Sequence, residues 1–170
     1  MPATPDFRSF AFATDRVRAS GKHVGRNVYW KIYVIENVLR VIVNSVLSAQ
    51  IGPNWWSVAV DRRIAQNAAN RRAQYARQPW HSQPGGHDIY CLFLSDLNEI
   101  VRANSHLFAP IIADIDQWMA RIEQIRLPRN IVGHMNWPTP TDSRRIDVVA
   151  SDITALADSL PSIGLPLRIP

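Results

Sequence analysis

The sequence predicts an all-α protein of about five helices. Apolar residues recur every three or four positions through most of the chain, the spacing that gathers side chains on one face of a helix. No segment alternates apolar and polar residues as a half-buried strand would, and no internal repeat is visible. Clusters of Gly and Pro separate the periodic segments, so we expect short connections between the helices.

The first two helices are expected over residues 27–50 and 55–78. Gly52, Pro53 and Asn54 separate them, and asparagine is a residue type that caps helix N-termini. The second helix becomes polar toward its end, so we expect that end to be solvated. The first helix carries its apolar residues on one face: Val28, Ile32, Ile35, Leu39, Ile42, Val43 and Val46.

The later helices follow a loop at residues 79–86 that is rich in Pro and Gly. We expect them over residues 90–108, 111–126 and 142–160. The last two are clearly amphipathic, with Ile, Val, Leu, Met and Trp at helical spacing. Each therefore has one face to bury against the rest of the bundle.

The chain of 170 residues, with 46% apolar residues and six Trp, is expected to fold as one globular domain. Its first 25 residues are polar and basic and contain two glycines. We therefore expect a basic N-terminal arm at residues 1–25, a helical domain at 26–160 and a Pro-rich tail at 161–170.

The charge of the chain favours a phosphate-bearing partner. Its formal net charge is +5, and seventeen of its 19 basic residues are Arg. The planar guanidinium group binds phosphate through two parallel hydrogen bonds. A GC-rich genome also raises the Arg content, and composition alone leaves both explanations open.

We expect a soluble protein of a reducing, cytoplasmic setting, because Cys91 is the one cysteine. Arg8 and Asp15 interrupt the N-terminal stretch where a signal peptide would need an apolar core. Polar residues also interrupt the most apolar segment, residues 29–47, so we expect no membrane span. The single Cys and scattered His predict no metal site, and nothing in the sequence predicts a cofactor.

One short turn carries the residues of a candidate active site. Pro128 follows Leu127 and is suited to the first turn of a helix, so we expect a short helix at residues 128–136. Asn130 and His134 are four residues apart and face the same side of such a helix. The Cα of Arg129 lies on a different side of this helix from His134. Its long side chain would therefore have to extend round the helix to approach His134.

The spacing Arg-x4-His is weak evidence by itself, because about half a match is expected by chance in a chain so rich in Arg. A second match does exist, from Arg18 to His23, in the polar N-terminal segment. The requirement of Asn directly after Arg lowers the chance expectation to about 0.03 matches. The full pattern is therefore moderately specific.

This Arg-polar-x3-His pattern resembles the signature of the HEPN superfamily, helical domains of which many are metal-independent RNA endonucleases. Three further segments are similar to the HEPN branch named after a yeast nuclear endonuclease of mRNA surveillance: IENVLR at 35–40, GPNWW at 52–56 and YCLFLSDL at 90–97. The resemblance covers about residues 27–160. It implies an HEPN-like bundle, forming a two-fold homodimer whose two Arg-x4-His turns share one cleft.

The residues of the turn suit RNA cleavage without a metal ion. Histidine is the residue type best suited to proton transfer near neutral pH, and His134 is the candidate general acid or base. Arg129 would bind the phosphate and stabilise the charge that develops on it, and Asn130 would orient phosphate or imidazole. A second His134 from the partner subunit would supply the complementary proton transfer. We expect 2′,3′-cyclic phosphate and 5′-hydroxyl ends.

Other candidate residues each have a structural alternative. Glu36 is expected to hold Arg129 or His134 in place, an assignment that the resemblance favours, or else to form an intrahelical pair with Arg40. Gly133 would let a partner helix or substrate approach closely, or is an ordinary helical glycine. Arg40 is expected to bind RNA. A basic track along the second helix is expected to follow the RNA backbone, or else to form a solvated face, and only Asp61 opposes its members: Arg62, Arg63, Arg71, Arg72 and Arg77.

We expect a homodimeric HEPN ribonuclease of the kind that acts as a toxin or in defence against phage. An antitoxin or another regulatory partner would control it. One alternative is a catalytically silent HEPN-type dimer that binds RNA or acts as an adaptor, and another is a plain helical interaction domain. Trp55 and Trp56 fit the core better than base stacking.

Overall fold

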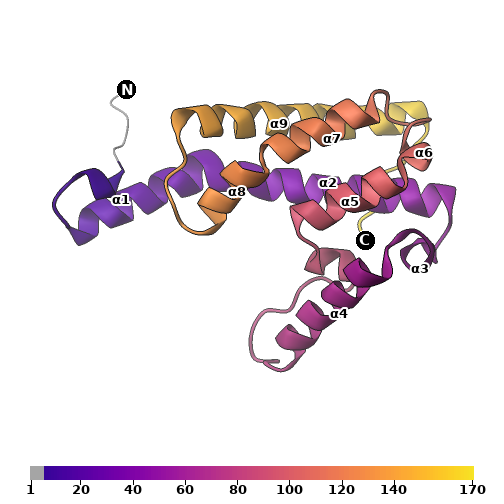
Figure 1. Cartoon of the computed structure of the whole chain (residues 1–170), viewed down its shortest axis with the longest axis horizontal. Helices are drawn as coiled ribbons and strands as arrows, with labels where there is room; N and C mark the ends of the chain where they lie inside the picture. Colours follow the sequence, from indigo (N-terminus) through magenta and orange to yellow (C-terminus); the bar gives the residue numbers. More distant parts are fainter. Residues whose placement is uncertain (1–5) are drawn as a thin grey trace.

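The structure, a computed structural model, describes residues 6–170 and is all-helical over that range, with no strand. Its longest feature is a continuous helix made of α1 (Thr14–Val24), a π-helical turn at Gly25–Tyr29, and α2 (Trp30–Gln50). Figure 1 shows α2 through the middle of the molecule, with α9 (Pro140–Ser159) beside it. The all-α prediction is confirmed over this range.

The core lies between α2 and the helices that cover it. These are α9, α5 (Leu94–Ala103), α6 (Ser105–Phe108) and α7 (Ile115–Gln124). All seven apolar residues predicted to share one face of the first helix are buried. Their side chains belong to one continuous apolar cluster, as expected for a single domain core.

The helix from Thr14 to Gln50 is long and apolar enough to span a membrane by length and composition alone. Within the bundle, however, 61% of its most apolar window is buried. Three polar residues, Glu36, Arg40 and Asn44, are buried with it and have hydrogen-bond partners inside the protein. In this structure the segment is the core helix of the bundle.

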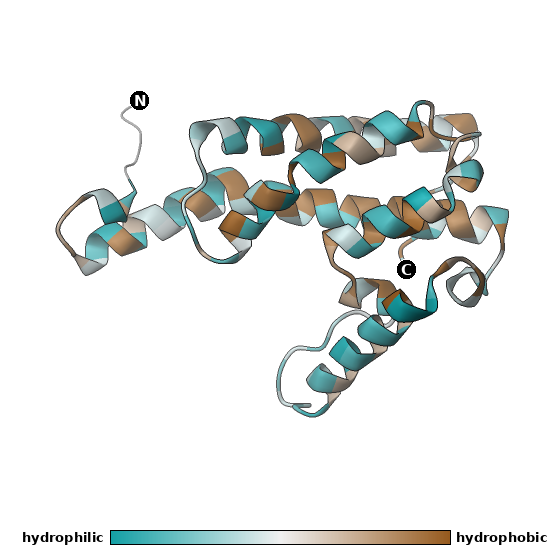
Figure 2. Ribbon diagram, in the orientation of Figure 1, coloured by the Kyte–Doolittle hydropathy of each residue, from teal (hydrophilic) through white to brown (hydrophobic). Residues whose placement is uncertain are grey.

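A polar lobe projects from one side of this bundle. It contains α3 (Trp55–Ala59), α4 (Arg62–Ala76) and the 3-10 turn η3 (Asp88–Cys91). Figure 2 shows that α4 is hydrophilic over most of its surface, and only Ile64 and Ala68 are buried in it. The predicted solvation of its far end is confirmed.

The expected count of about five helices is too low, because single residues interrupt the predicted helices. Val60 is extended, and the Asp61 carboxylate caps α4 by accepting a 2.8 Å hydrogen bond from the backbone N–H of Arg63. The helix expected from residue 55 is divided there. Asn104 similarly separates α5 from α6, and Asp114 has a left-handed conformation before α7.

The described parts of the expected arm and tail are more ordered than the sequence suggests; residues 1–5 of the arm lie outside the described residues. The expected N-terminal arm is helical from Thr14, since Gly21 and Gly25 cost helix stability without stopping a helix. His23 stacks on Trp137 at 5.0 Å between ring centroids, which holds α1 to the segment after α8.

The predicted C-terminal tail packs against α2. It begins with the 3-10 turn η4 (Leu160–Ile163), and Leu165 is buried. The backbone N–H of Arg168 donates to Ser45 Oγ at 2.8 Å, and Asn44 Nδ2 donates to the Arg168 carbonyl at 3.0 Å. These contacts satisfy polar groups that α2 would otherwise bury alone.

Candidate functional site

The predicted catalytic turn forms α8 (Arg126–Gly133), which lies between α7 and α9 in sequence and packs against both. α8 begins earlier than expected because Ile125 alone interrupts the chain of helical residues. Pro128 then lies within the first turn, where its missing N–H costs little. α8 also ends earlier, with His134 as its C-terminal cap and Met135 in a left-handed conformation (φ 59°).

Arg129 lies along the face of α8 that Gly133 shares and extends across to α2. Its Nε donates a 2.6 Å hydrogen bond to Glu36 Oε1 on α2. Its Nη1 lies 3.4 Å from Asn130 Oδ1 and 3.6 Å from the position that a Cβ on Gly133 would take. The guanidinium group is therefore beside the residue that precedes His134. Its side chain is 27% exposed, so its outer edge remains open to a ligand.

Glu36 makes both of the contacts that the sequence offered as alternatives. Oε1 binds Arg129, and Oε2 accepts a 3.1 Å hydrogen bond from Nη2 of Arg40. The Glu36 side chain is only 11% exposed, and a carboxylate so placed needs partners to offset its desolvation. Glu36 is therefore a positioning residue that holds Arg129.

Arg40 is an anchor, because each of its three guanidinium nitrogens donates to the protein. Nε donates to the Ile89 carbonyl at 3.3 Å, and Nη2 donates to the Leu92 carbonyl at 3.0 Å as well as to Glu36. Nη1 lies 3.3 Å from Asn37 Oδ1. The residue predicted to bind RNA thus ties η3 to α2 and supplies a fixed positive charge behind the site.

His134 is exposed at the end of α8. Its backbone N–H donates to the Asn130 carbonyl at 2.9 Å, which keeps the last turn of α8 closed. No hydrogen bond joins its imidazole to any of residues 6–170, so both ring nitrogens are open to a ligand. Arg129 contacts both Glu36 and Asn130, and His134 directly follows Gly133, the residue that Arg129 approaches.

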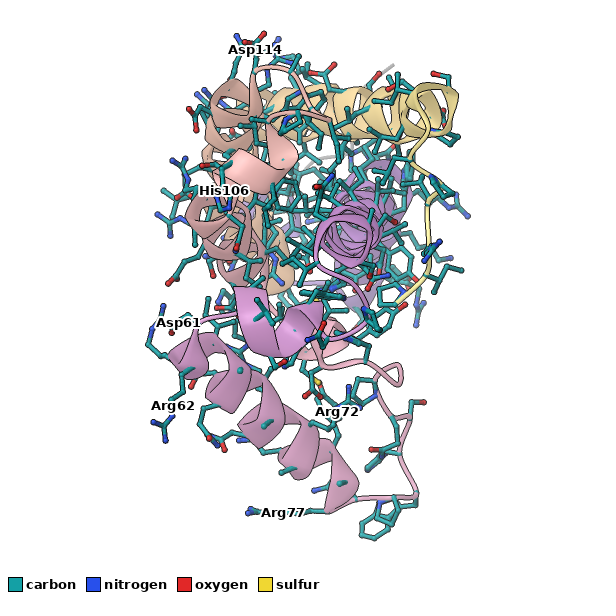
Figure 3. All side chains as sticks on the ribbon, turned by 90° about the vertical axis from the view of Figure 1, so that its right-hand side faces the viewer. Asp61, Arg62, Arg72, Arg77, His106 and Asp114 are labelled. Atoms are coloured by element: carbon teal, nitrogen blue, oxygen red, sulfur yellow. The ribbon has the colours of Figure 1, made fainter. Side chains whose placement is uncertain are left out.

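The arginines of α4 are less free than predicted, because carboxylates from η3 and α5 oppose them as well as Asp61. Arg63 pairs with Glu99 at 2.5 Å, Arg71 pairs with Asp96 at 2.7 Å, and Arg72 pairs with Asp88. Figure 3 shows Arg62 and Arg77 pointing outward from α4. Within the described part of the chain these two have no ion-pair partner, so the expected continuous basic track is corrected to two exposed charges.

A cavity of about 600 Å³ lies beside Arg129, between α2, α4, η3 and the loop of residues 77–87. We call it the α4 cleft. Its charged lining groups are Glu36, Arg40, Arg71 and Arg129, and its aromatic ones are Tyr75, His81, Tyr90 and Phe93. None of these aromatic residues was predicted to act in the site. Tyr90 and Phe93 lie in the YCLFLSDL segment, which was the available signal.

Other sequence-derived candidates are structural. Trp55 is buried and donates from Nε1 to Asn44 Oδ1 at 3.1 Å, which confirms its placement in the core. Cys91 is buried in the wall of the α4 cleft, and this burial raises the pKa of its thiol. Residues 6–170 contain no group of three or more His, Cys, Asp or Glu placed to hold a metal ion.

Comparison of the chain with protein-family models, curated proteins and solved structures found no match. A function for it is therefore inferred from the site itself.

Proposed function

We propose that the protein is a metal-independent RNA endonuclease of the HEPN type. The observation that carries the proposal is the placement of Arg129. Its guanidinium is held by the buried Glu36 carboxylate, lies beside Gly133 and stays 27% exposed, and the exposed His134 follows Gly133 in the chain. A fixed cation beside a free imidazole is what phosphodiester cleavage by an internal 2′-OH requires.

In the proposed reaction the 2′-oxygen attacks its own phosphate while His134 removes the 2′-OH proton. The P–O5′ bond breaks, and a second imidazole protonates the leaving 5′-oxygen. Arg129 binds the non-bridging oxygens and stabilises the charge that grows on them. Asn130 orients the phosphate. The products carry 2′,3′-cyclic phosphate and 5′-hydroxyl ends, and DNA is resistant because it lacks the nucleophile.

The second imidazole belongs to a second copy of the chain. Two apolar residues on the outer face of α8 support this part of the proposal, because Leu127 is 62% exposed and Ile131 is 41% exposed. On α2, Trp30 and Tyr33 are exposed as well. Large apolar side chains exposed at a surface can form a subunit interface. A toxin or phage-defence role in the cytoplasm, restrained by an antitoxin, fits such an enzyme.

The proposal is tested by incubating labelled RNA in EDTA with the wild type, Arg129→Ala and His134→Ala. Matched controls are His106→Ala and Arg144→Ala, which remove exposed residues of the same types elsewhere on the surface. We expect cleavage by the wild type and both controls. Each site variant should lose about 100-fold or more in rate, the contribution of one acid–base or charge-stabilising group.

Undiminished cleavage by His134→Ala would contradict the proposal. RNA binding without cleavage by the wild type would instead support the silent adaptor. Growth arrest on expression of the wild type, absent with His134→Ala, is the control for an activity that needs a cellular activator.

A further inference from the structure

The α4 cleft has the size and lining of a binding site for a nucleotide, and this inference rests on the proposed function. Its volume of about 600 Å³ is within the range usual for ligand sites. Arg129 lines the cleft and also belongs to the candidate active site. A phosphate held by Arg129 would therefore lie against the lining of the cleft.

Arg71 supplies the cleft with a second fixed cation. Its Nη1 donates to Asp96 Oδ2 at 2.7 Å and to the Cys91 carbonyl at 2.8 Å. Its guanidinium lies over the Phe93 ring, 3.8 Å from the ring centroid. These contacts leave Nη2 without a hydrogen-bond partner among residues 6–170. The cation is thus held flat and presents one edge to the cleft.

The aromatic wall of the cleft is supported from behind. A Cβ on Gly85 would lie 2.5 Å from Tyr90 Cδ2, so the Tyr90 ring packs directly on the backbone of the loop. Gln83 Nε2 ties that loop to three carbonyls, those of Tyr75, Gln78 and His81, at 3.2, 3.2 and 3.0 Å. The loop is therefore a built wall of the cleft.

Two rings remain open to a ligand. Tyr75 is 50% exposed and Phe93 is 49% exposed, and both line the cleft. Exposed aromatic rings beside arginine form the usual site for an unpaired base, which stacks on the ring while the cations bind its phosphates. The combination of rings and cations favours a nucleotide over an inorganic anion, which needs no rings, or an apolar ligand, which needs no cations.

We propose that the α4 cleft binds the nucleoside adjacent to the cleaved phosphate of a single-stranded RNA. The base stacks on Tyr75 or Phe93, and the flanking phosphates lie on the open edges of Arg71 and Arg129. A paired base cannot enter a cavity without leaving its helix. The cleft therefore selects single-stranded RNA over duplex RNA. Because α4 forms one wall of the cleft, α4 contributes to this selectivity.

The test is fluorescence anisotropy with a labelled 2′-O-methyl RNA oligonucleotide, which the protein cannot cleave. The wild type is compared with Tyr75→Ala and Phe93→Ala, and both positions are exposed enough for alanine to be tolerated in the fold. Phe12→Ala and Arg144→Ala are matched controls at exposed positions outside the cleft. We expect each cleft variant to weaken binding about tenfold, the loss of one base–aromatic stack, with both controls unchanged.

Equal affinity for all five proteins would overturn the proposal, and so would an equal loss in the controls. A second arm uses a nucleoside 3′-monophosphate and an RNA duplex as competitors. We expect the mononucleotide to compete weakly and the duplex less well than the single strand. If the mononucleotide saturates the protein and the oligonucleotide does not displace it, the cleft is a regulatory site. That result would contradict the proposal that the cleft binds the RNA substrate.

Failure of the proposed function gives a different result. Tight, Tyr75-dependent binding of RNA without cleavage of unmodified RNA would support the proposed cleft and contradict the proposed nuclease activity. Cleavage whose KM and kcat are both unaffected by Tyr75→Ala and Phe93→Ala would support the nuclease activity and contradict the proposed role of the cleft.

Discussion

At the scale of single residues, the site depends on one carboxylate shared by two guanidinium groups. Glu36, Arg40 and Arg129 have side chains that are 11%, 10% and 27% exposed. Removing the negative charge would leave two cations close together in a poorly solvated place. The same change frees Arg129 to leave the position at which it would meet a phosphate.

We therefore predict that Glu36→Gln lowers the free energy of unfolding by about 3 kcal/mol, as is usual when a buried pair loses one partner. It should also lower kcat for RNA cleavage more than it raises KM. Glu99→Gln is the matched control, because its pair with Arg63 is exposed and contributes close to nothing. Urea unfolding that does not distinguish the two variants would contradict this account of Glu36.

His87 makes the stability of the fold depend on pH. Burial, assisted by nearby Arg72 and opposed by Asp88, lowers the pKa of His87 below its ordinary value of 6.5. Its Nδ1 accepts a 3.1 Å hydrogen bond from the backbone N–H of Ile89, so the folded protein requires that nitrogen to be unprotonated. The ring also stacks on Trp55 at 5.3 Å between centroids.

The unfolded chain therefore binds a proton at His87 more readily than the folded one. We predict that this stabilisation is complete above pH 6.5 and is lost as the pH falls from 6.5 through the lower folded pKa. Urea midpoints measured across that window check it. His87→Asn keeps a cap acceptor that does not titrate, and it should flatten the dependence. His106→Ala, at an exposed position, should leave it unchanged, and an equally steep slope in His87→Asn would contradict the prediction.

At the scale of helices, the apolar pattern of the sequence predicted which helix faces are buried better than it predicted where the helices begin and end. The apolar periodicity of residues 27–50 identified the buried face of α2, because burial acts on every turn of a helix. The breaks at Val60 and Asn104 depend on how short helices pack, and no Gly or Pro marks those positions. Pro128 predicted the boundary before α8, which lies at Ile125. The N-terminal helix was missed for the opposite reason, since its glycines suggested a break that packing on Trp137 overrides.

The loop of residues 77–87 offers a matched pair of glycines. A Cβ on Gly85 would collide with the Tyr90 ring at 2.5 Å, whereas a Cβ on Gly86 has no neighbour within 4 Å. We predict that Gly85→Ala costs about 1–3 kcal/mol of stability, as overpacking usually does, and displaces the loop from Tyr90. Gly86→Ala should be close to neutral. Thermal unfolding compares them, and equal midpoints would show that the loop does not pack on Tyr90 as described.

At the scale of the whole molecule, the sequence predicted the fold class and a set of polar residues that the structure partly gathers. Arg129 contacts both Asn130 and Glu36, as the motif and its resemblance implied. The α4 cleft was not predicted. Its walls come from α2, α4, a loop and η3, and only the tertiary packing of these segments brings them together. The ion pairs of Arg63 and Arg72 were not predicted either, because their carboxylate partners are distant in sequence.

The central claim is that two copies of the chain form one RNA-cleaving site, each contributing Arg129 and His134. The most direct measurement is the rate of RNA cleavage in EDTA after one part of wild type is refolded with nine parts of His134→Ala. If both subunits are required, random pairing lowers the rate per wild-type chain about tenfold, while His106→Ala as the diluent causes no loss. A rate per wild-type chain that stays constant on dilution with His134→Ala would show that each chain acts alone, and would contradict the shared site.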